Sequence, residues 1–317
     1  MKEIVTVTGP IAPEELGFCQ CHEHIAMSKG KSWYLNPALR IDDMAKSLEE
    51  VRRYKSCGGD SFIDAQPCGC NRMAEELRKL SVKSGVHIIA STGFHKLCFY
   101  PDSHWIHSIS EAELEKVFVR ELTTGMYTDA DCTYPSVQSS VKAGIIKTAY
   151  DTEELSPRYK KLFRAAASAS LRTERIIMIH VEQDTNPILL QDFLLNLGMQ
   201  PENLMFCHMD RACRDIRTHK DILKKGSYLE FDTIGRFKYH SDEHEIQIIQ
   251  SLVDIGYATQ LLYSLDTTSD RLMSYNPDAI GLNYILTKFN ASLKSSGISE
   301  DIIHMLSIEN PARILTQ

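Results

Sequence analysis

Apolar and polar residues alternate along this chain in a regular order. Short runs rich in Ile, Val, Phe and Tyr are separated by longer stretches in which apolar residues recur with the period of a helix. The short runs predict strands near 17–23, 60–66, 86–93, 143–149, 176–181, 204–209, 227–233 and 260–266. The longer stretches predict helices near 42–56, 72–84, 111–126, 157–172, 187–198, 213–225 and 242–256, with a final pair near 278–295 and 299–308.

The strand runs indicate the fold class. They are continuously apolar rather than alternating, which is typical of a parallel sheet buried on both faces. Eight such strands with crossover helices predict a (β/α)8 barrel formed by one domain, 1–317. An open doubly wound sheet is the alternative, but that fold usually has a Gly-rich turn after its first strand, where this chain has HEHIAMSKG. Asp42 is expected to begin the first helix, and Asn310–Pro311 to stop the last.

Composition narrows the class of partner and compartment. The net charge of −7 gives no general attraction to nucleic acid or to anionic membranes, so neither is expected as a partner. The opening MKEIVTVTGPIAPEELG lacks the apolar core of a signal peptide, and no stretch approaches the roughly 18 apolar residues of a membrane span. Nine scattered cysteines fit reduced thiols, so we expect a cytoplasmic protein. Two C-x-C pairs lack the C-x2-C spacing usual in zinc knuckles.

Candidate metal ligands fall at the ends of the predicted strands. His22 and His24 are two residues apart in a strand, so both imidazoles point to one side and can reach one cation. A bare H-x-H pair is a weak signal, because two exposed loop histidines would look the same. The signal strengthens with four more residues in the same kind of place: Lys147, His180, His208 and Asp266.

The set of six is hard to explain as packing. Charged groups at the ends of apolar strands are costly to bury unless they are paired or bound to metal. For any single residue, a satisfied polar group at the rim is an equally good reading. Since catalytic groups converge at the carboxyl ends of barrel strands, the set favours a functional site.

The segments around these residues resemble the phosphotriesterase family of the amidohydrolase superfamily. The resemblance rests on GFCQCHEHI, AGIIKTA, IHVEQ, FCHMDR, SLDTT and ENPARIL, in that order along the chain. The opening TGPIAPEELGF is also similar to that family's opening, so a short β segment is expected before the barrel.

The resemblance implies a role for each of the six. His22 and His24, with Asp266, would hold the more buried of two divalent cations, and His180 with His208 the more exposed one. Lys147 would bridge both as N6-carboxylysine, an anion that replaces a side chain unable to ligate as an ammonium. Zinc is the expected metal, and Mn2+, Co2+ and Fe2+ suit the same ligands.

The site implies hydrolysis by metal-activated hydroxide. Asp266 would accept the released proton, with His208 as a route outward. No cysteine lies in a recognisable nucleophile motif. Relatives are often dimers, so a homodimer is the assembly that the resemblance favours.

Substrate specificity in barrels comes from the loops after the strands. His95 and Lys96 follow the third strand and are candidates to contact substrate, with an exposed loop pair as the alternative. Lactone-hydrolysing relatives carry an aromatic residue or tyrosine about where His95 falls. A cationic cradle is predicted from four further loop residues, Arg236, Lys238, Arg271 and Tyr275. Asp210 and Arg211 are expected either to pair or to orient a substrate hydroxyl. The alternative interpretation is that all these residues form a solvated rim of charges with no role in binding.

Polar and basic loops favour one branch of the family. An acyl tail or a neutral triester would prefer apolar loops. We therefore expect a lactonase that acts on a sugar lactone. A phosphorylated sugar lactone is the more specific form of this hypothesis. Phosphotriesterase or carboxylesterase activity is the alternative, and a non-catalytic metal-binding barrel is a further one. A decayed enzyme would be expected to lose Lys147 or Asp266, and this chain keeps both.

Overall fold

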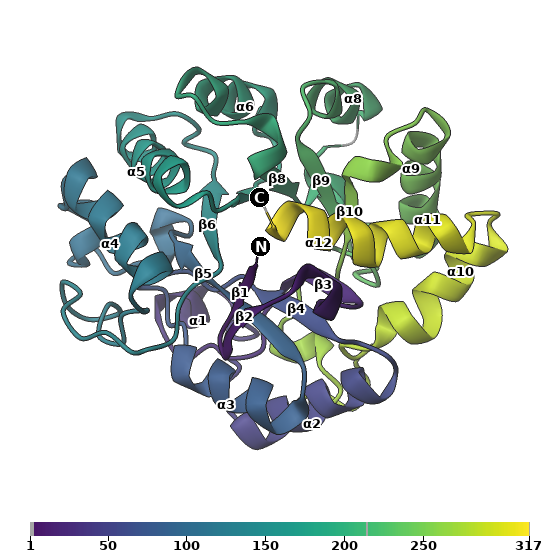
Figure 1. Cartoon of the computed structure of the whole chain (residues 1–317), viewed down its shortest axis with the longest axis horizontal. Coiled ribbons are helices and arrows are strands. Elements are labelled where there is room, and N and C mark those ends of the chain that lie inside the picture. Colours follow the sequence, from purple (N-terminus) through teal and green to yellow (C-terminus); the bar gives the residue numbers. More distant parts are fainter. Residues whose placement is uncertain (1–2, 214, 317) are drawn as a thin grey trace.

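Eight parallel strands form one sheet in the computed structural model, which describes residues 3–213 and 215–316. The strands follow one another around the sheet in sequence order, which confirms the predicted barrel (Figure 1). Their bounds are β3 Cys19–Glu23, β4 Ser61–Asp64, β5 His87–Gly93, β6 Ile145–Tyr150, β7 Ile177–Val181, β8 Leu204–Cys207, β9 Tyr228–Phe231 and β10 Leu261–Tyr263.

The seam between β10 and β3 is closed by a side chain. In the described residues no regular ladder joins these two strands, although the Asp266 backbone N–H donates to the His22 carbonyl at 2.9 Å. The buried Glu23 carboxylate accepts hydrogen bonds from the Leu265 N–H at 2.9 Å and from the Thr267 N–H and hydroxyl at 3.1 and 2.7 Å. These bonds replace the missing ladder and complete the ring.

Helices surround the strands (Figure 1). Those between strands are α2 Met44–Ser56, α3 Ala74–Ser84, α4 Glu111–Thr123, α5 Pro157–Thr173, α6 Pro187–Asn196, α8 Ile216–Lys224 and α9 Asp242–Asp254. The C-terminal part holds α10 Asn290–Ser295, α11 Glu300–His304 and α12 Asn310–Leu315, with π-helical turns at Ile285–Phe289 and Met305–Glu309. Two short helices, α1 Lys31–Leu35 and α7 Met209–Ala212, were not expected from the sequence pattern.

Both predicted helix boundary signals are wrong. Asp43, not Asp42, caps α2, because its carboxylate accepts from two backbone N–H groups of the first turn, while Asp42 pairs with Arg40 at 2.7 Å. The chain also stays helical through Asn310–Pro311. The helix runs without a break from α11 through the π-helical turn Met305–Glu309 into α12, so Pro311 lies inside it. The Asn310 N–H donates to the Met305 carbonyl, and this wider turn directly before the proline accommodates its ring and its missing N–H.

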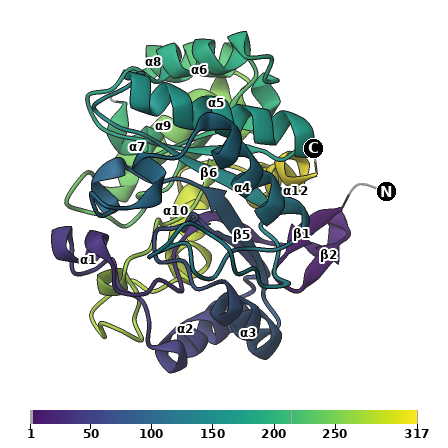
Figure 2. The ribbon, with the colours of Figure 1, turned by 90° about the vertical axis from the view of Figure 1, so that its left-hand side faces the viewer.

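The inside of the barrel is packed by alternate residues of the strands. Residues such as Ile63, Met178 and Leu262 form a buried apolar cluster separate from the larger core between strands and helices. Ile4 and Ile314 join this inner cluster, so the N-terminal hairpin of β1 (Ile4–Thr6) and β2 (Gly9–Ile11) closes the barrel floor together with α12. Figure 2 shows the hairpin and α12 at one end of the barrel, and α1 and α7 at the other, where the strands end.

Two further observations bear on the expectations from composition. No helix in the described part of the chain is long and apolar enough to cross a membrane. All nine cysteines carry free thiols, and Cys98 and Cys132 are exposed.

Replacing Asn310 should destabilise the fold. Its buried side-chain amide donates to the carbonyls of Ala258 and Leu261, both at 2.8 Å, and so ties α12 to the start of β10. Asn310→Ala leaves both carbonyls without this donor, and we expect a loss of about 1–3 kcal/mol in the free energy of unfolding. Chemical denaturation measures it, with exposed Asn196→Ala as the control. Equal stability of the two variants would contradict the role given to this amide.

Candidate metal centre

A bulge in β3 turns the two neighbouring histidines into the barrel. Gln20 pairs with Phe62 and Glu23 with Asp64, so β3 holds one residue more than β4 over this stretch. Cys19 and Cys21, before the extra residue has taken effect, belong to the inner cluster. Beyond the bulge the inward side passes to His22 and His24, which line a cavity at the carboxyl ends of the strands.

The other four predicted ligands reach the same place from other strands of the ring. Lys147 lies on β6, and His180 on β7, each two residues beyond a side chain of the inner cluster. His208 and Asp266 follow the ends of β8 and β10. All six side chains therefore converge at one end of the barrel, and five of the six are buried.

The distances define one half of the centre. The Lys147 amine donates to His22 Nε2 at 3.0 Å. One carboxylate oxygen of Asp266 lies 3.7 Å from His22 Nε2 and 3.6 Å from His24 Nε2. The ligand atoms of His22, His24 and Asp266 all lie within 4.8 Å of one another, which is close enough to share a cation.

The other half consists of two imidazoles in contact. His208 Nε2 lies 2.7 Å from His180 Nδ1. Burial lowers the pKa of His180 to about 4, and burial together with the facing Lys147 lowers that of His22 to about 4, so both rings are neutral near pH 7. A neutral imidazole with a free nitrogen lone pair is the form that binds metal.

Asp232 holds two of these rings in position. It follows β9, and its two carboxylate oxygens accept from His22 Nδ1 at 2.8 Å and from His208 Nδ1 at 2.6 Å. Burial alone would raise the pKa of Asp232, but the facing His208 and His22 hold it below its ordinary value. Because an ionised carboxylate can only accept, each ring must carry its proton on Nδ1 and present its Nε2 lone pair to the centre.

This geometry supplies a test of fit for metal. With the proton of His208 on Nδ1, its Nε2 presents a lone pair to His180 Nδ1. The other nitrogen of His180, Nε2, lies 3.4 Å from the Glu182 carboxylate and donates to it, so His180 Nδ1 also carries a lone pair. Two lone pairs that face each other at this distance repel, and a cation between them removes the repulsion. The donor set of imidazoles and one carboxylate suits zinc and its neighbours, so the residues present fit the metals that the sequence implied.

Two of the candidate ligands have an unusual backbone. His208 has φ +61° and Asp266 has φ +49°, both in the left-handed region that residues with a Cβ rarely adopt. Local hydrogen bonds hold them there. The His208 N–H donates to Asp232 at 3.1 Å, and the Asp266 N–H donates to the His22 carbonyl. Strained backbone of this kind is frequent at functional sites.

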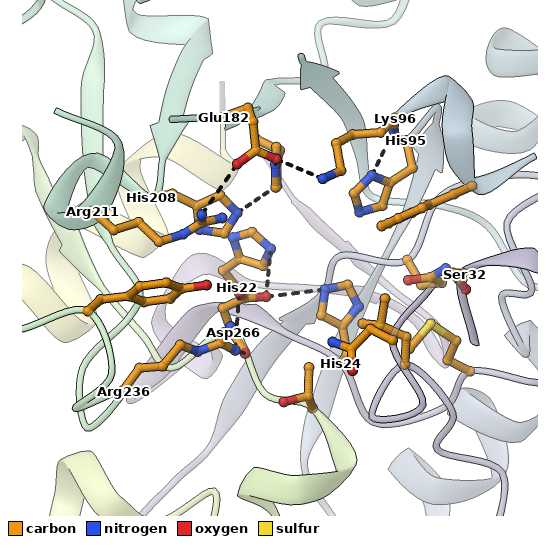
Figure 3. A pocket seen from close by; sticks show the side chains of 18 residues that line it. His22, His24, Ser32, His95, Lys96, Glu182, His208, Arg211, Arg236 and Asp266 are labelled. Carbon is orange, nitrogen blue, oxygen red and sulfur yellow. Dashed lines mark hydrogen bonds and ion pairs between the residues drawn. The ribbon is translucent and has the colours of Figure 1, made fainter. Parts of the chain in front are cut away.

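The candidate ligands open into a polar cavity. Its volume is about 760 Å3, including the part open to solvent. Figure 3 shows His22, His24, His208 and Asp266 on its floor, with charged side chains around them. The wall includes three cationic residues: Lys96, Arg211 and Arg236.

Glu182 joins several parts of this wall. Its carboxylate lies 2.7 Å from Lys96 Nζ and 3.6 Å from Arg211 Nη1, besides the contact with His180 (Figure 3). Burial raises the pKa of Glu182, but His180 and Lys96 lower it further, so the net shift is downward. Arg211 therefore does not pair through its guanidinium with Asp210, as one of the sequence-based alternatives had it.

The residues predicted to contact substrate are not all brought together. His95 and Arg236 line the cavity, and Arg236 lies 3.3 Å from Asp266. Arg271 is buried beneath the wall and donates to the Ile234 carbonyl, and burial lowers its pKa to about 10. Lys238 is exposed and lines a separate hollow.

Tyr275 points away from the centre. Its hydroxyl contacts the Ser47 hydroxyl and donates to the Asp43 carbonyl, both at 2.8 Å, so it ties its loop to α2. The predicted cradle of four residues is thus not assembled: Arg236 faces the candidate ligands, whereas Lys238, Arg271 and Tyr275 lie elsewhere.

Sequence reasoning missed Asp232 and Glu182, although a signal existed for each. Asp232 ends the seventh apolar run just as Asp266 ends the eighth. Glu182 lies two residues after His180, on the same side of an extended chain. Both are acidic groups in the positions where ligands were sought.

Comparison with known proteins agrees with the fold. The sequence profile of the phosphotriesterase family matches residues 2–315. The chain therefore belongs to the phosphotriesterase family, which confirms the resemblance carried by its motifs. As a member of this family it is a hydrolase, and its buried histidines and acids form a cluster that could hold metal.

Three similar proteins illustrate the match. A phospho-furanose lactonase of Mycoplasmopsis synoviae (strain 53) is 28% identical, over 98% of this chain and 90% of its own. The structure of an amidohydrolase from Mycoplasma synoviae superposes with a TM-score of 0.93 at 27% identity, covering 99% of this chain and 92% of the other. A lactonase from Listeria monocytogenes gives 0.89 at 28% identity, covering 99% of both chains.

Asp232→Asn should impair the centre without unfolding the protein. An amide presents one acceptor and one donor, so it cannot accept from both His22 and His208, and one ring loses its orientation. We expect metal affinity to fall about 10- to 100-fold. Isothermal titration with Zn2+ measures it, with exposed Asp278→Asn as the control. Unchanged affinity in Asp232→Asn would show that the shared carboxylate does not position the ligands.

Proposed function

We propose that this chain is a binuclear metal-dependent lactonase whose substrate is a phosphorylated sugar lactone. One observation carries the proposal: five candidate ligands line a cavity that has three cationic side chains on its wall, and the sixth, Lys147, is buried beside His22. The floor suits the hydrolysis of an ester bond, and the wall suits an anionic group on the substrate. The relative named phospho-furanose lactonase supports the same substrate class.

The roles of the ligands follow from their grouping. His22, His24 and Asp266 would hold one divalent cation, and His180 and His208 the other. Zn2+ is the expected ion. When bound, the two ions supply an activated water and polarise the lactone carbonyl.

Lys147 would bridge the two ions as N6-carboxylysine. Its side chain is fully buried, with His22 and Met178 as the partners of its amine, and within the described ranges it forms no ion pair with a carboxylate. An ammonium without an acidic partner is costly in such a place. Addition of CO2 to the neutral amine, with release of a proton, would give a carbamate anion whose charge two bound divalent cations would balance.

Asp266 is the proposed acceptor for the proton of the attacking water. Its Oδ1 faces the two imidazoles of β3, and its Oδ2 faces Arg236. Burial raises the pKa of Asp266, but Arg236 and His24 lower it further, so the carboxylate is ionised and able to accept. Both nitrogens of His208 are engaged with Asp232 and His180, so its part in passing the proton outward stays a prediction.

The phosphate would bind at the wall formed by Lys96, Arg211 and Arg236. Arg211 is the most useful probe, because it lines the cavity and its guanidinium pairs with Glu182 rather than with a candidate ligand. His95 lies between this wall and the floor, with its ring centroid 5.4 Å from that of His180, and would contact the sugar.

The substrate proposal predicts a selective effect of Arg211→Gln. Loss of a charge-assisted hydrogen bond should lower kcat/KM about 10- to 100-fold for a phosphorylated furanose lactone and little for the unphosphorylated compound. Steady-state assays on matched pairs of lactones measure this, with Lys238→Gln as the control outside the cavity. Activity restricted to long-chain acyl lactones or neutral triesters would rule out the proposed substrate.

The metal assignment predicts that Lys147→Ala and Asp266→Asn lose turnover. Wild-type protein should contain about two divalent ions per chain, and removing the bridge or the proton acceptor should reduce kcat by several orders of magnitude. Elemental analysis and assays on the same samples test both points. Full activity in either variant, on any substrate that the wild type turns over, would refute the assigned roles.

A further inference from the structure

A second cluster of metal-binding residue types lies beside the centre. It consists of Asp210 at the start of α7, His240 in the loop after β9, and Glu245 in the first turn of α9. His240 Nε2 lies 3.2 Å from Glu245 Oε2 and 3.9 Å from Asp210 Oδ2. The ligand atoms of the three residues all lie within 4.8 Å of one another, and none of the three belongs to the proposed pair of metal sites.

Glu245 is the residue that calls for a ligand. Its side chain is fully buried, and neither of its carboxylate oxygens accepts a hydrogen bond from an N–H or hydroxyl donor in the described ranges. The nearby His240 nitrogen is close to Oε2 but makes no hydrogen bond with it. A buried carboxylate left in this state carries the full penalty of its desolvation.

The neighbouring carboxylate of Asp210 adds to the cost of burying Glu245. Asp210 accepts from the backbone N–H groups of Thr233 at 2.6 Å and Arg211 at 2.8 Å, so each of its two oxygens already has a backbone donor. Burial and Asp210 both raise the pKa of Glu245. Within the described residues, no arginine or lysine forms an ion pair with Asp210 or Glu245. Two adjacent buried acids need a positive charge or a shared proton between them.

His240 is oriented to complete a cation site. Its Nδ1 lies 3.2 Å from the Ser241 carbonyl, which can only accept, so Nδ1 carries the proton and the Nε2 lone pair faces the two acids. The Thr233 hydroxyl lies 3.0 Å from the same Nε2, and its oxygen would be a fourth ligand atom for a cation. Two carboxylates, one imidazole and a hydroxyl suit a divalent ion such as Mn2+ or Zn2+ better than a soft metal.

The cluster can be reached from outside. Asp210 and His240 line a hollow of about 1010 Å3, including its open part, together with Tyr239 and His244. This hollow is distinct from the cavity over the six candidate ligands, although Arg211 and Tyr239 border both. An ion could therefore enter without passing through the substrate cavity.

We propose that Asp210, His240 and Glu245 bind a divalent cation at a site of their own. The ion would join the end of β8, the loop after β9 and the first turn of α9. Because Asp210 also holds the Thr233 N–H, directly after Asp232, the ion would stiffen the backbone that carries the carboxylate shared by two candidate ligands. This site does not depend on the proposed lactonase activity.

Anomalous diffraction at the manganese absorption edge tests the proposal on crystals of the full chain soaked in Mn2+. We expect a peak between Asp210 Oδ2, His240 Nε2 and Glu245 Oε2 in the wild type. The peak should be lost in Glu245→Gln, which keeps the shape of the side chain. It should persist in His244→Gln, which changes a residue of the hollow outside the cluster. Peaks at the six candidate ligands are read separately, so failure of the proposed function would not affect this result.

A measurement in solution complements the crystals. In Mn2+ titrations followed by electron paramagnetic resonance, Glu245→Gln should lack a class of about one ion per chain, or bind it about 10-fold or more weakly, relative to wild type and His244→Gln. Absence of the peak from wild-type crystals would overturn the proposal in favour of a proton shared by Asp210 and Glu245. A peak that survives unchanged in Glu245→Gln would overturn it as well. The wild-type crystal decides the matter even if a variant fails to fold.

Discussion

The carboxylate of Glu23 holds the first and last strands of the barrel together, and three candidate ligands depend on this contact. Burial raises its pKa to about 7, although hydrogen bonds from Thr267 and Leu265 act in the opposite direction. Glu23 lies between His22 and His24 in the sequence, and its partners flank Asp266. The bonds that close the ring therefore also set the distance between the ligands on its two edges. The contacts that close the barrel are therefore the same contacts that bring these ligands together.

A shared carboxylate extends this arrangement around the ring. Asp232 orients His22 from β3 and His208 from β8 through one pair of oxygens, so groups that are distant in sequence are adjusted together. His180 is oriented by a different acid, Glu182, which also contacts Lys96 and Arg211. Asp232 lies below the candidate ligands and does not line the cavity, whereas Glu182 lies at the cavity wall. Substitutions in the cavity wall that change the substrate could therefore alter the surroundings of Glu182 and leave those of Asp232 unchanged.

Much of this could be predicted from the sequence, because strand ends leave a local signal. Each of the eight strands shows as an apolar run, and a charged or imidazole side chain at the end of such a run has few structural explanations. This reasoning found the barrel and brought Lys147, His180, His208 and Asp266 to one place. What it could not find depends on contacts between distant segments. Tyr275 is bound to α2, Arg271 is buried under a neighbouring loop, and the partners of Glu182 come from two other loops. Local pattern also misjudged Pro311, because a π-helical turn directly before it lets the helix continue through the proline.

The bulge in β3 has a consequence for how this gene can vary. Substitution at His22 or His24 removes one ligand at a time and leaves the rest of the ring in register. Loss of a single codon between Gln20 and Glu23 would instead restore regular pairing with β4 and exchange the inward and outward sides of the strand end. An in-frame deletion of one residue would therefore act as a null allele.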